Sequence, residues 1–125
     1  MLFLTIFFTS ILQIKGCGIA THSEVVERAL ANYDNDAFGK SEIRRILLEH
    51  QDAFQAGAPF PDTFYNTLCQ GGDFHNQAED IHWGQYQKVA WGYFRKTYPD
   101  PIGNVDAERL IAFIFGLTSH QVIPC

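Results

Sequence analysis

A helix built from residues 110–117 (LIAFIFGL) would be apolar on every side. Such a helix is stable only when other elements surround it. Asn104 and Asp106 precede it as polar residues near which a helix can begin, and we expect the helix to run towards His120. The sequence therefore predicts a central, fully buried helix within a larger helical assembly.

Three further segments place apolar residues at helical spacing. The first follows Thr21 and Glu24, which have the form of a capping box. The second follows Ser41, a residue suited to capping, and closes at Gly57. The third covers about residues 81–98 and would turn one set of side chains inward: Trp83, Tyr86, Val89, Ala90, Phe94 and Tyr98. No strong strand or hairpin signal is present, so the predicted fold class is all-α.

Two segments are predicted to lack regular structure. Residues 58–62 contain Pro59 and Pro61, which forbid a regular helix. Residues 63–80 include the pair Gly71-Gly72 and are expected to form an irregular loop with at most one short turn.

The N-terminal apolar run, residues 2–12, is too short to span a bilayer comfortably. We interpret residues 1–16 as a secretory signal peptide, which predicts a secreted, extracellular chain of residues 17–125 with no transmembrane segment after cleavage. Two alternatives are a buried N-terminal helix and a bacterial lipoprotein signal that ends at Cys17.

Charge and cysteine content restrict the partners and the compartment. The chain has 125 residues and a net charge of −5, and it has no basic stripe of the kind that binds nucleic acid. It contains Cys17, Cys69 and Cys125, of which two can pair in an oxidising compartment. Cys17 with Cys69 is the favoured pair, because Cys125 is the last residue of the sequence.

Five histidines offer nitrogen ligands for a metal. Hydrolytic zinc sites combine histidine nitrogen with carboxylate oxygen and leave one position open for water. Asp62 follows two prolines, which stiffen its backbone, and the candidate ligands beside it are His22, His82 and His120. His50 and His75 are interpreted as ordinary core or surface residues, and the sequence has neither an HExxH nor a CxxC motif.

Four runs carry a resemblance to a known family: CGIATH at residues 17–22, HQDAFQAGAPFPDTFY at 50–65, LCQGGDFH at 68–75 and IAFIFGLTSH at 111–120. In this order and spacing they resemble the start of glycosylphosphatidylinositol-specific phospholipases D. That group belongs with the zinc-dependent bacterial phospholipases C and the fungal single-strand nucleases, which are all-α and hold three zinc ions.

The resemblance implies specific roles for the candidate ligands. Asp62, His82 and His120 match three ligands of one zinc. His22 matches a ligand of a second zinc, which the backbone amine and carbonyl of Cys17 would also bind. The implied reaction hydrolyses the phosphodiester that ties a glycan-linked protein to its membrane lipid, and it leaves phosphatidic acid in the membrane.

One departure from the family pattern concerns the residue four positions after His120. The family has an aspartate there that bridges two metals, whereas this chain has Pro124. We therefore expect an incomplete, truncated version of the domain with little or no activity of its own. Two alternatives remain: a non-catalytic secreted fragment that binds metal, membrane or protein, and a disulfide-held helical bundle without metal.

Overall fold

The computed structural model describes residues 18–33, 42–65 and 74–122, and within these ranges every regular element is a helix. The helices, in chain order, are α1 (Ile19–Ala31), α2 (Glu42–Glu49), α3 (Gln51–Gly57), α4 (Phe60–Thr63), α5 (His75–His82), α6 (Gly84–Thr97) and α7 (Val105–Val122). The predicted all-α class is confirmed.

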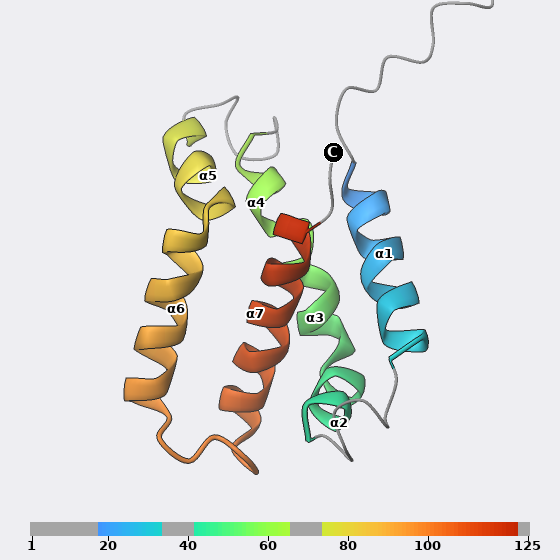
Figure 1. Ribbon diagram of the computed structural model, residues 1–125, viewed down its shortest axis with the longest axis vertical. Helices are drawn as coiled ribbons and strands as arrows, with labels where there is room; N and C mark the ends of the chain where they lie inside the picture. Colours follow the sequence, from blue (N-terminus) through green and yellow to red (C-terminus); the bar gives the residue numbers. More distant parts are fainter. Residues whose placement is uncertain (1–17, 34–41, 66–73, 123–125) are drawn as a thin grey trace, which may run out of the picture.

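Helix α7 lies at the centre of the arrangement (Figure 1), with α6 on one side and α3 and α1 on the other. The start of α1, the helices α4 and α5, and the end of α7 all lie at the same end of the molecule. The side chains that these four segments carry can therefore meet there.

The core forms around α7, as its apolar sequence predicted. Ile111, Ala112, Ile114 and Leu117 are at most 4% exposed, and no residue between 110 and 117 is classed as exposed. Leu110, Phe113 and Phe115 are half-buried, so the helix is central without being fully buried. The main partners from other helices are Val26, Leu30, Ile46, Leu47, Phe54 and Phe94.

Helices α3 and α7 cross with their backbones in contact at two glycines. A Cβ atom added at Gly116 would lie 2.0 Å from the carbonyl oxygen of Phe54, and one added at Gly57 would lie 2.2 Å from that of Phe113. Neither position can accept a larger residue unless the backbones move apart. The pair therefore fixes how closely α3 approaches α7.

Two of the predicted helices are each divided into two. The second breaks at His50, where φ is −117° and ψ is 43°, which separates α2 from α3. The third extends further back than predicted, to His75, and breaks at Trp83, where the backbone is extended with ψ of 149°. Residues 75–80 are thus helical rather than irregular, and the interpretation of this part of the loop was wrong.

The predicted helix starts and the proline segment also need correction. Helix α1 begins after Gly18 without a side-chain cap, so Thr21 lies inside the first turn and no capping box forms. Residues 60–63 form the single turn α4, which tolerates Pro61 because proline at the first helical positions removes no intrahelical hydrogen bond. Ser41 and residues 66–73 lie outside the described residues.

Helix α6 buries fewer side chains than its pattern predicted. Phe94 is 4% exposed, and Ala90 and Tyr98 pack against the core. In contrast, Trp83 and Val89 are 64% and 70% exposed, and Tyr86 is 37% exposed. The reason is that α6 packs mainly against α5 and α7, which cover only one of its sides.

An ion-pair network joins α2 to the start of α7. The Arg45 guanidinium donates to both oxygens of Glu108, at 2.6 and 3.2 Å, and the Gly103 amide donates to the same carboxylate at 2.8 Å. These bonds hold the pKa of the buried Glu108 down, at about 2, with the Arg45 hydrogen bonds as the largest cause.

Candidate metal centre

Four helices deliver the candidate ligands to one end of the molecule (Figure 1). His22 lies near the start of α1, Asp62 in α4, His82 at the end of α5 and His120 near the end of α7. Residues separated by almost 100 positions in the chain therefore lie side by side.

Asp62 stands between the imidazoles. Its Oδ2 lies 3.3 Å from Nε2 of His22, and its Oδ1 lies 3.3 Å from Nε2 of His82 and 3.7 Å from Nε2 of His120. The His22 and His120 rings stack with their centroids 4.1 Å apart, and the His82 ring meets that of His120 edge-on at 4.8 Å. His22, Asp62 and His120 offer ligand atoms that all lie within 4.8 Å of one another, whereas His82 is not part of this group and lies 3.3 Å from Asp62.

In His82 and His120, the hydrogen bond made by Nδ1 determines whether Nε2, the nitrogen that faces Asp62, carries a hydrogen. His82 Nδ1 lies 2.7 Å from the Ala78 carbonyl oxygen, and His120 Nδ1 lies 2.8 Å from that of Ala58. A carbonyl oxygen can only accept, so each Nδ1 carries the donated hydrogen and, in the neutral ring, each Nε2 carries a lone pair. Two acceptors, an imidazole lone pair and a carboxylate oxygen, then face each other.

Burial favours the neutral form of His120. The side chain is 7% exposed, and this burial, followed by the charge of His22, lowers the pKa of His120 below its ordinary value. A proton is therefore a poor means of relieving the contact between acceptors, whereas a cation shared by Nε2 and Asp62 relieves it without charging the ring.

Access differs among the four residues. His22 and His120 are buried, whereas the side chains of Asp62 and His82 are 26% and 22% exposed. The site is thus closed on one side and open to water on the other. His22 Nδ1 is buried and has no hydrogen-bond partner among the described residues, so it is one further nitrogen free to act as a ligand.

The proline segment holds Asp62 in place. The Asp62 amide donates to the Pro59 carbonyl at 3.0 Å, and the Tyr65 amide donates to the Asp62 carbonyl at 3.1 Å. Phe60 packs edge-on against Phe113 of α7, with centroids 5.0 Å apart. These contacts fix α4 against the helix that carries His120.

Sequence reasoning missed two residues that support His82. The Tyr65 ring lies 5.0 Å from the His82 ring, and its hydroxyl donates to the Glu79 carboxylate. Burial and this carboxylate raise the pKa of Tyr65. The available signal was spacing, because Glu79 precedes His82 by three residues and shares its side of α5.

A family model described as zinc-dependent phospholipase C matches residues 21–123. This chain belongs to that family. It is 43% identical over 122 residues to phosphatidylinositol-glycan-specific phospholipase D of Rattus norvegicus, 45% identical over 106 residues to that of Bos taurus and 46% identical over 105 residues to that of Homo sapiens. The alignments cover 98%, 85% and 84% of this chain but only 14%, 12% and 12% of those relatives. No solved structure gives a significant match.

The donor set fits the metal in the family's description. Zinc binds histidine nitrogen and carboxylate oxygen, and two ligands about 2.1 Å from a tetrahedral ion lie about 3.4 Å apart. The separations of 3.3, 3.3 and 3.7 Å around Asp62 are close to that spacing. The Nδ1–carbonyl bonds of His82 and His120 are also typical of histidines that bind zinc, because they orient the ring.

Of the other predicted or possible ligands, some lie outside the described residues and one, His50, lies away from this centre. Cys17 and Cys69, and with them the proposed disulfide, lie outside the described residues, and the His75 side chain does too. His50 lies elsewhere, 3.5 Å from Glu108, in a group with Glu49. Arg45 already pairs with both carboxylates, so that group is an ion-pair network.

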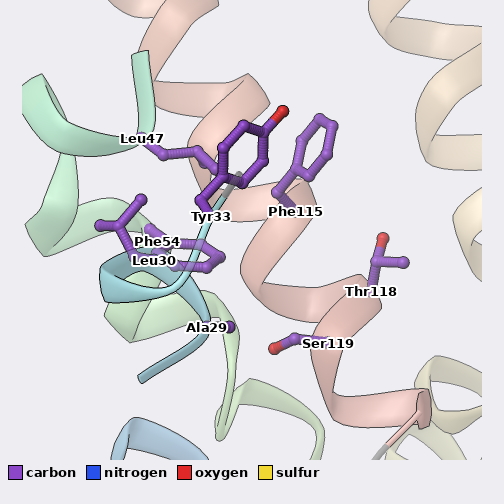
Figure 2. A pocket seen from close by; sticks show the side chains of 8 residues that line it. All are labelled: Ala29, Leu30, Tyr33, Leu47, Phe54, Phe115, Thr118 and Ser119. Carbon is purple, nitrogen blue, oxygen red and sulfur yellow. The ribbon is translucent and has the colours of Figure 1, made fainter. Parts of the chain in front are cut away.

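An apolar pocket of about 240 Å³ lies beside α7 (Figure 2). Its wall comes from α1, α2, α3 and α7, with Tyr33 beyond the end of α1: Ala29, Leu30, Tyr33, Leu47, Phe54, Phe115, Thr118 and Ser119. The hydroxyls of Thr118 and Ser119 donate to carbonyls of their own helix. None of the four candidate ligands lines this pocket, so the proposed chemistry does not involve it.

Proposed function

We propose that this chain forms part of a secreted, zinc-dependent phosphodiesterase of the phosphatidylinositol-glycan-specific phospholipase D type. Its substrate would be the phosphodiester of a glycosylphosphatidylinositol anchor, and phosphatidic acid would stay in the membrane. The support is the family match together with the convergence of His22, Asp62, His82 and His120.

The observation that carries the proposal is the arrangement of lone pairs around Asp62. His82 and His120 have their hydrogens committed to backbone carbonyls, and both direct Nε2 towards Oδ1 of Asp62. These three residues would hold one zinc ion. His22 faces the other oxygen, Oδ2, and would hold a second ion with the backbone groups of Cys17.

Each residue has a defined task in this proposal. Asp62 would offset part of the positive charge of a bound metal, and its two oxygens face different histidines. The buried side chains of His22 and His120 would close the inner side of the site against water. When bound, zinc would supply a Lewis acid for a phosphoryl oxygen and would lower the pKa of a water molecule to about 7. The half-exposed side of Asp62 and His82 is the side from which a phosphodiester can approach.

We expect little hydrolysis from this chain alone. Hydrolysis of phosphodiesters is helped by several metals that clamp the attacking and leaving oxygens together. Pro124 stands where the family has a bridging aspartate, so that part of the clamp is missing. The second candidate function is therefore a non-catalytic secreted metal-binding protein, which the same ligand geometry supports.

The leader and the compartment belong to the same proposal. Residues 1–16 would be a signal peptide, removed on secretion, and Cys17 would pair with Cys69 outside the cell. Expression in a secreting cell line, followed by N-terminal sequencing of the medium protein, tests this. A sequence starting at Cys17 is expected, and retention of the chain inside cells with Met1 intact would contradict it.

Zinc binding is tested with matched aspartate variants. Asp62→Asn removes the central negative charge, whereas Asp52→Asn alters an exposed carboxylate that pairs with the exposed Arg109. We expect calorimetric titration to give tight zinc binding for the parent chain and for Asp52→Asn, and at least about a tenfold loss for Asp62→Asn. Equal zinc affinity for all three proteins would refute the assigned centre. Release of a lipid-anchored protein, measured in parallel, distinguishes the phosphodiesterase from the metal-binding protein.

A further inference from the structure

Helix α6 presents large apolar side chains to solvent along one side. Trp83 at its N-cap, Tyr86, Val89 and Tyr93 are 64%, 37%, 70% and 65% exposed. Within the helix, Tyr86, Val89 and Tyr93 are spaced by three and four residues and lie on one side, and Trp83 is exposed just before the first turn. We name these four side chains the α6 aromatic face. In Figure 1, α6 forms the outer edge of the molecule, with α7 on its inner side.

Among the described residues, Trp83, Val89 and Tyr93 leave most of their surface outside the internal packing, and Tyr86 is 37% exposed. A different side of α6 contacts the core, where Phe94 is buried and Ala90 and Trp91 pack against the cluster around α7. Exposed apolar patches of a few hundred square ångströms on a protein are often functional. The exposure of three aromatic rings and a valine close together therefore indicates an external partner.

The charge of α6 is opposite to that of the rest of the chain. The helix contains Lys88, Arg95 and Lys96 and neither aspartate nor glutamate, whereas the whole chain has a net charge of −5. The nearest carboxylates along the sequence, Asp80 and Asp100, lie beyond the two helix ends. Arg95 and Lys96 also suit the negative end of the helix dipole, but Lys88 lies in the middle of the helix. The complementary partner is an anionic surface.

Size and side-chain chemistry favour a lipid surface over a second protein. The four side chains expose on the order of 400 Å², judging from about 150–250 Å² for an aromatic side chain, and a stable protein interface needs about 800 Å² per partner. Tryptophan and tyrosine have an apolar body and a polar end, and they gather where membranes meet water. A helix with such a face and nearby lysines binds anionic bilayers through both groups.

We propose that the α6 aromatic face is a contact surface for an anionic phospholipid bilayer. The proposal rests on the proposed function, since a glycosylphosphatidylinositol anchor is cleaved at the membrane. The face starts at Trp83, directly after His82, whose own side chain turns towards Asp62 at 3.3 Å. A bilayer in contact with this face would therefore lie next to the open side of the metal centre.

The test uses the zinc-free full chain and sedimentation with sucrose-loaded vesicles. One set is pure phosphatidylcholine, and the other contains about 30% phosphatidylserine. We expect the parent chain to prefer the anionic set and the triple variant Trp83→Ser/Val89→Ser/Tyr93→Ser to bind at least about tenfold more weakly, a change of about 1.4 kcal/mol. The double variant Lys88→Glu/Lys96→Glu should lose the preference for phosphatidylserine.

The matched control changes exposed apolar residues elsewhere on the molecule. Leu48→Ser/Ile102→Ser/Val122→Ser alters side chains that are 45%, 54% and 74% exposed, and we expect it to bind vesicles as the parent does. Far-ultraviolet circular dichroism shows whether each variant keeps its helices, which is expected because all substituted side chains are at the surface.

Three outcomes would overturn the proposal. They are no vesicle binding by the parent chain, equal binding by the aromatic-face variant, and lipid-free dimerisation that the same variant abolishes. The last outcome would make the face an interface between copies of the chain. Asp62→Asn keeps the α6 aromatic face intact, so its vesicle binding separates a failure of this proposal from a failure of zinc binding or hydrolysis.

Discussion

Asp62 concentrates the chemistry of the candidate centre in one side chain, because each of its oxygens faces imidazole nitrogen. A carboxylate in this position can neutralise part of the charge of a metal and bridge two ions. The surrounding histidines have less freedom, since backbone carbonyls fix the rings of His82 and His120. The site is therefore preorganised by hydrogen bonds of the main chain.

The zinc-free chain should lose stability as the pH falls below about 6.5, the ordinary pKa of histidine. The pKa of His120 is lowered in the folded protein, so the unfolded chain binds more protons in this range and unfolding becomes more favourable as acid is added. Urea denaturation between pH 7.5 and 5 in the presence of a chelator measures this slope. His120→Gln should flatten the curve, and an unchanged slope in that variant would show that another group is responsible.

At the scale of elements, the contact between α3 and α7 sets the spacing of the ligands. Asp62 follows α3 by five residues, and His120 follows Gly116 by four. A change in the distance between these helices therefore moves Asp62 relative to His120.

Gly116→Ala should destabilise the chain by about 3 kcal/mol, because its Cβ would overlap the Phe54 carbonyl and separate the two helices. We also expect zinc affinity to fall by about tenfold, the scale seen when the support of metal ligands is disturbed. Thermal unfolding and zinc titration measure the two effects. Gly92→Ala is the control, since its Cβ meets nothing within 4 Å in α6 and should stabilise the helix by about 0.5–1 kcal/mol.

Glu108→Gln should weaken the connection between α2 and α7. The variant removes the charge that binds Arg45 while keeping the shape, and we expect a loss of about 1–3 kcal/mol at pH 7. The depressed pKa of Glu108, about 2, means that its contribution is present above pH 4.5 and is lost between pH 4.5 and 2. Chemical denaturation should therefore show the two proteins converging near pH 2, and a constant difference across that range would contradict this account.

Apolar spacing predicted the helical elements better than it predicted their ends. The central helix was predictable because residues 110–117 leave no polar side. The breaks at His50 and Trp83 were not, because the residues on either side are compatible with a continuous helix and tertiary packing decides the kink. The exposed positions of Trp83 and Val89 were mispredicted for a related reason: apolar character does not reveal which side of a helix finds a neighbour.

The candidate centre needed more than a residue count. Asp62, His22, His82 and His120 were candidates from their placement in the sequence, and it was the resemblance that assigned them to two zinc ions. These side chains meet because of how four helices pack together, and local sequence patterns do not predict that packing. Glu79 could have been found from its three-residue spacing from His82, but Tyr65 could not, because its hydrogen bond to Glu79 joins α5 to the residues after α4 and no local pattern predicts that contact.

For the whole molecule, zinc should raise the temperature of unfolding. A ligand that binds only the folded state stabilises it by about 2.7 kcal/mol at a concentration one hundred times its dissociation constant, which for a domain of this size is a shift of several degrees. Differential scanning calorimetry with and without zinc tests this. Asp62→Asn should show a clearly smaller shift, in line with its weaker binding, and magnesium at the same concentration serves as the metal control.

None of the described helices combines the length and apolar character that crossing a bilayer requires. The molecule is also asymmetric in charge, because the charged side chains of α6 are all positive while the whole chain has a net charge of −5.

The order of the ligands along the chain has a consequence for biosynthesis. His22 and Asp62 leave the ribosome early, His82 follows, and His120 comes almost 60 residues after Asp62. A nascent polypeptide that ends between His82 and His120 contains Asp62, His22 and His82 but lacks the complete central helix, against which the other helices pack. A metal held by all four ligands would then be acquired only after translation has passed His120, so the compartment in which the polypeptide finishes folding would determine which ion it meets.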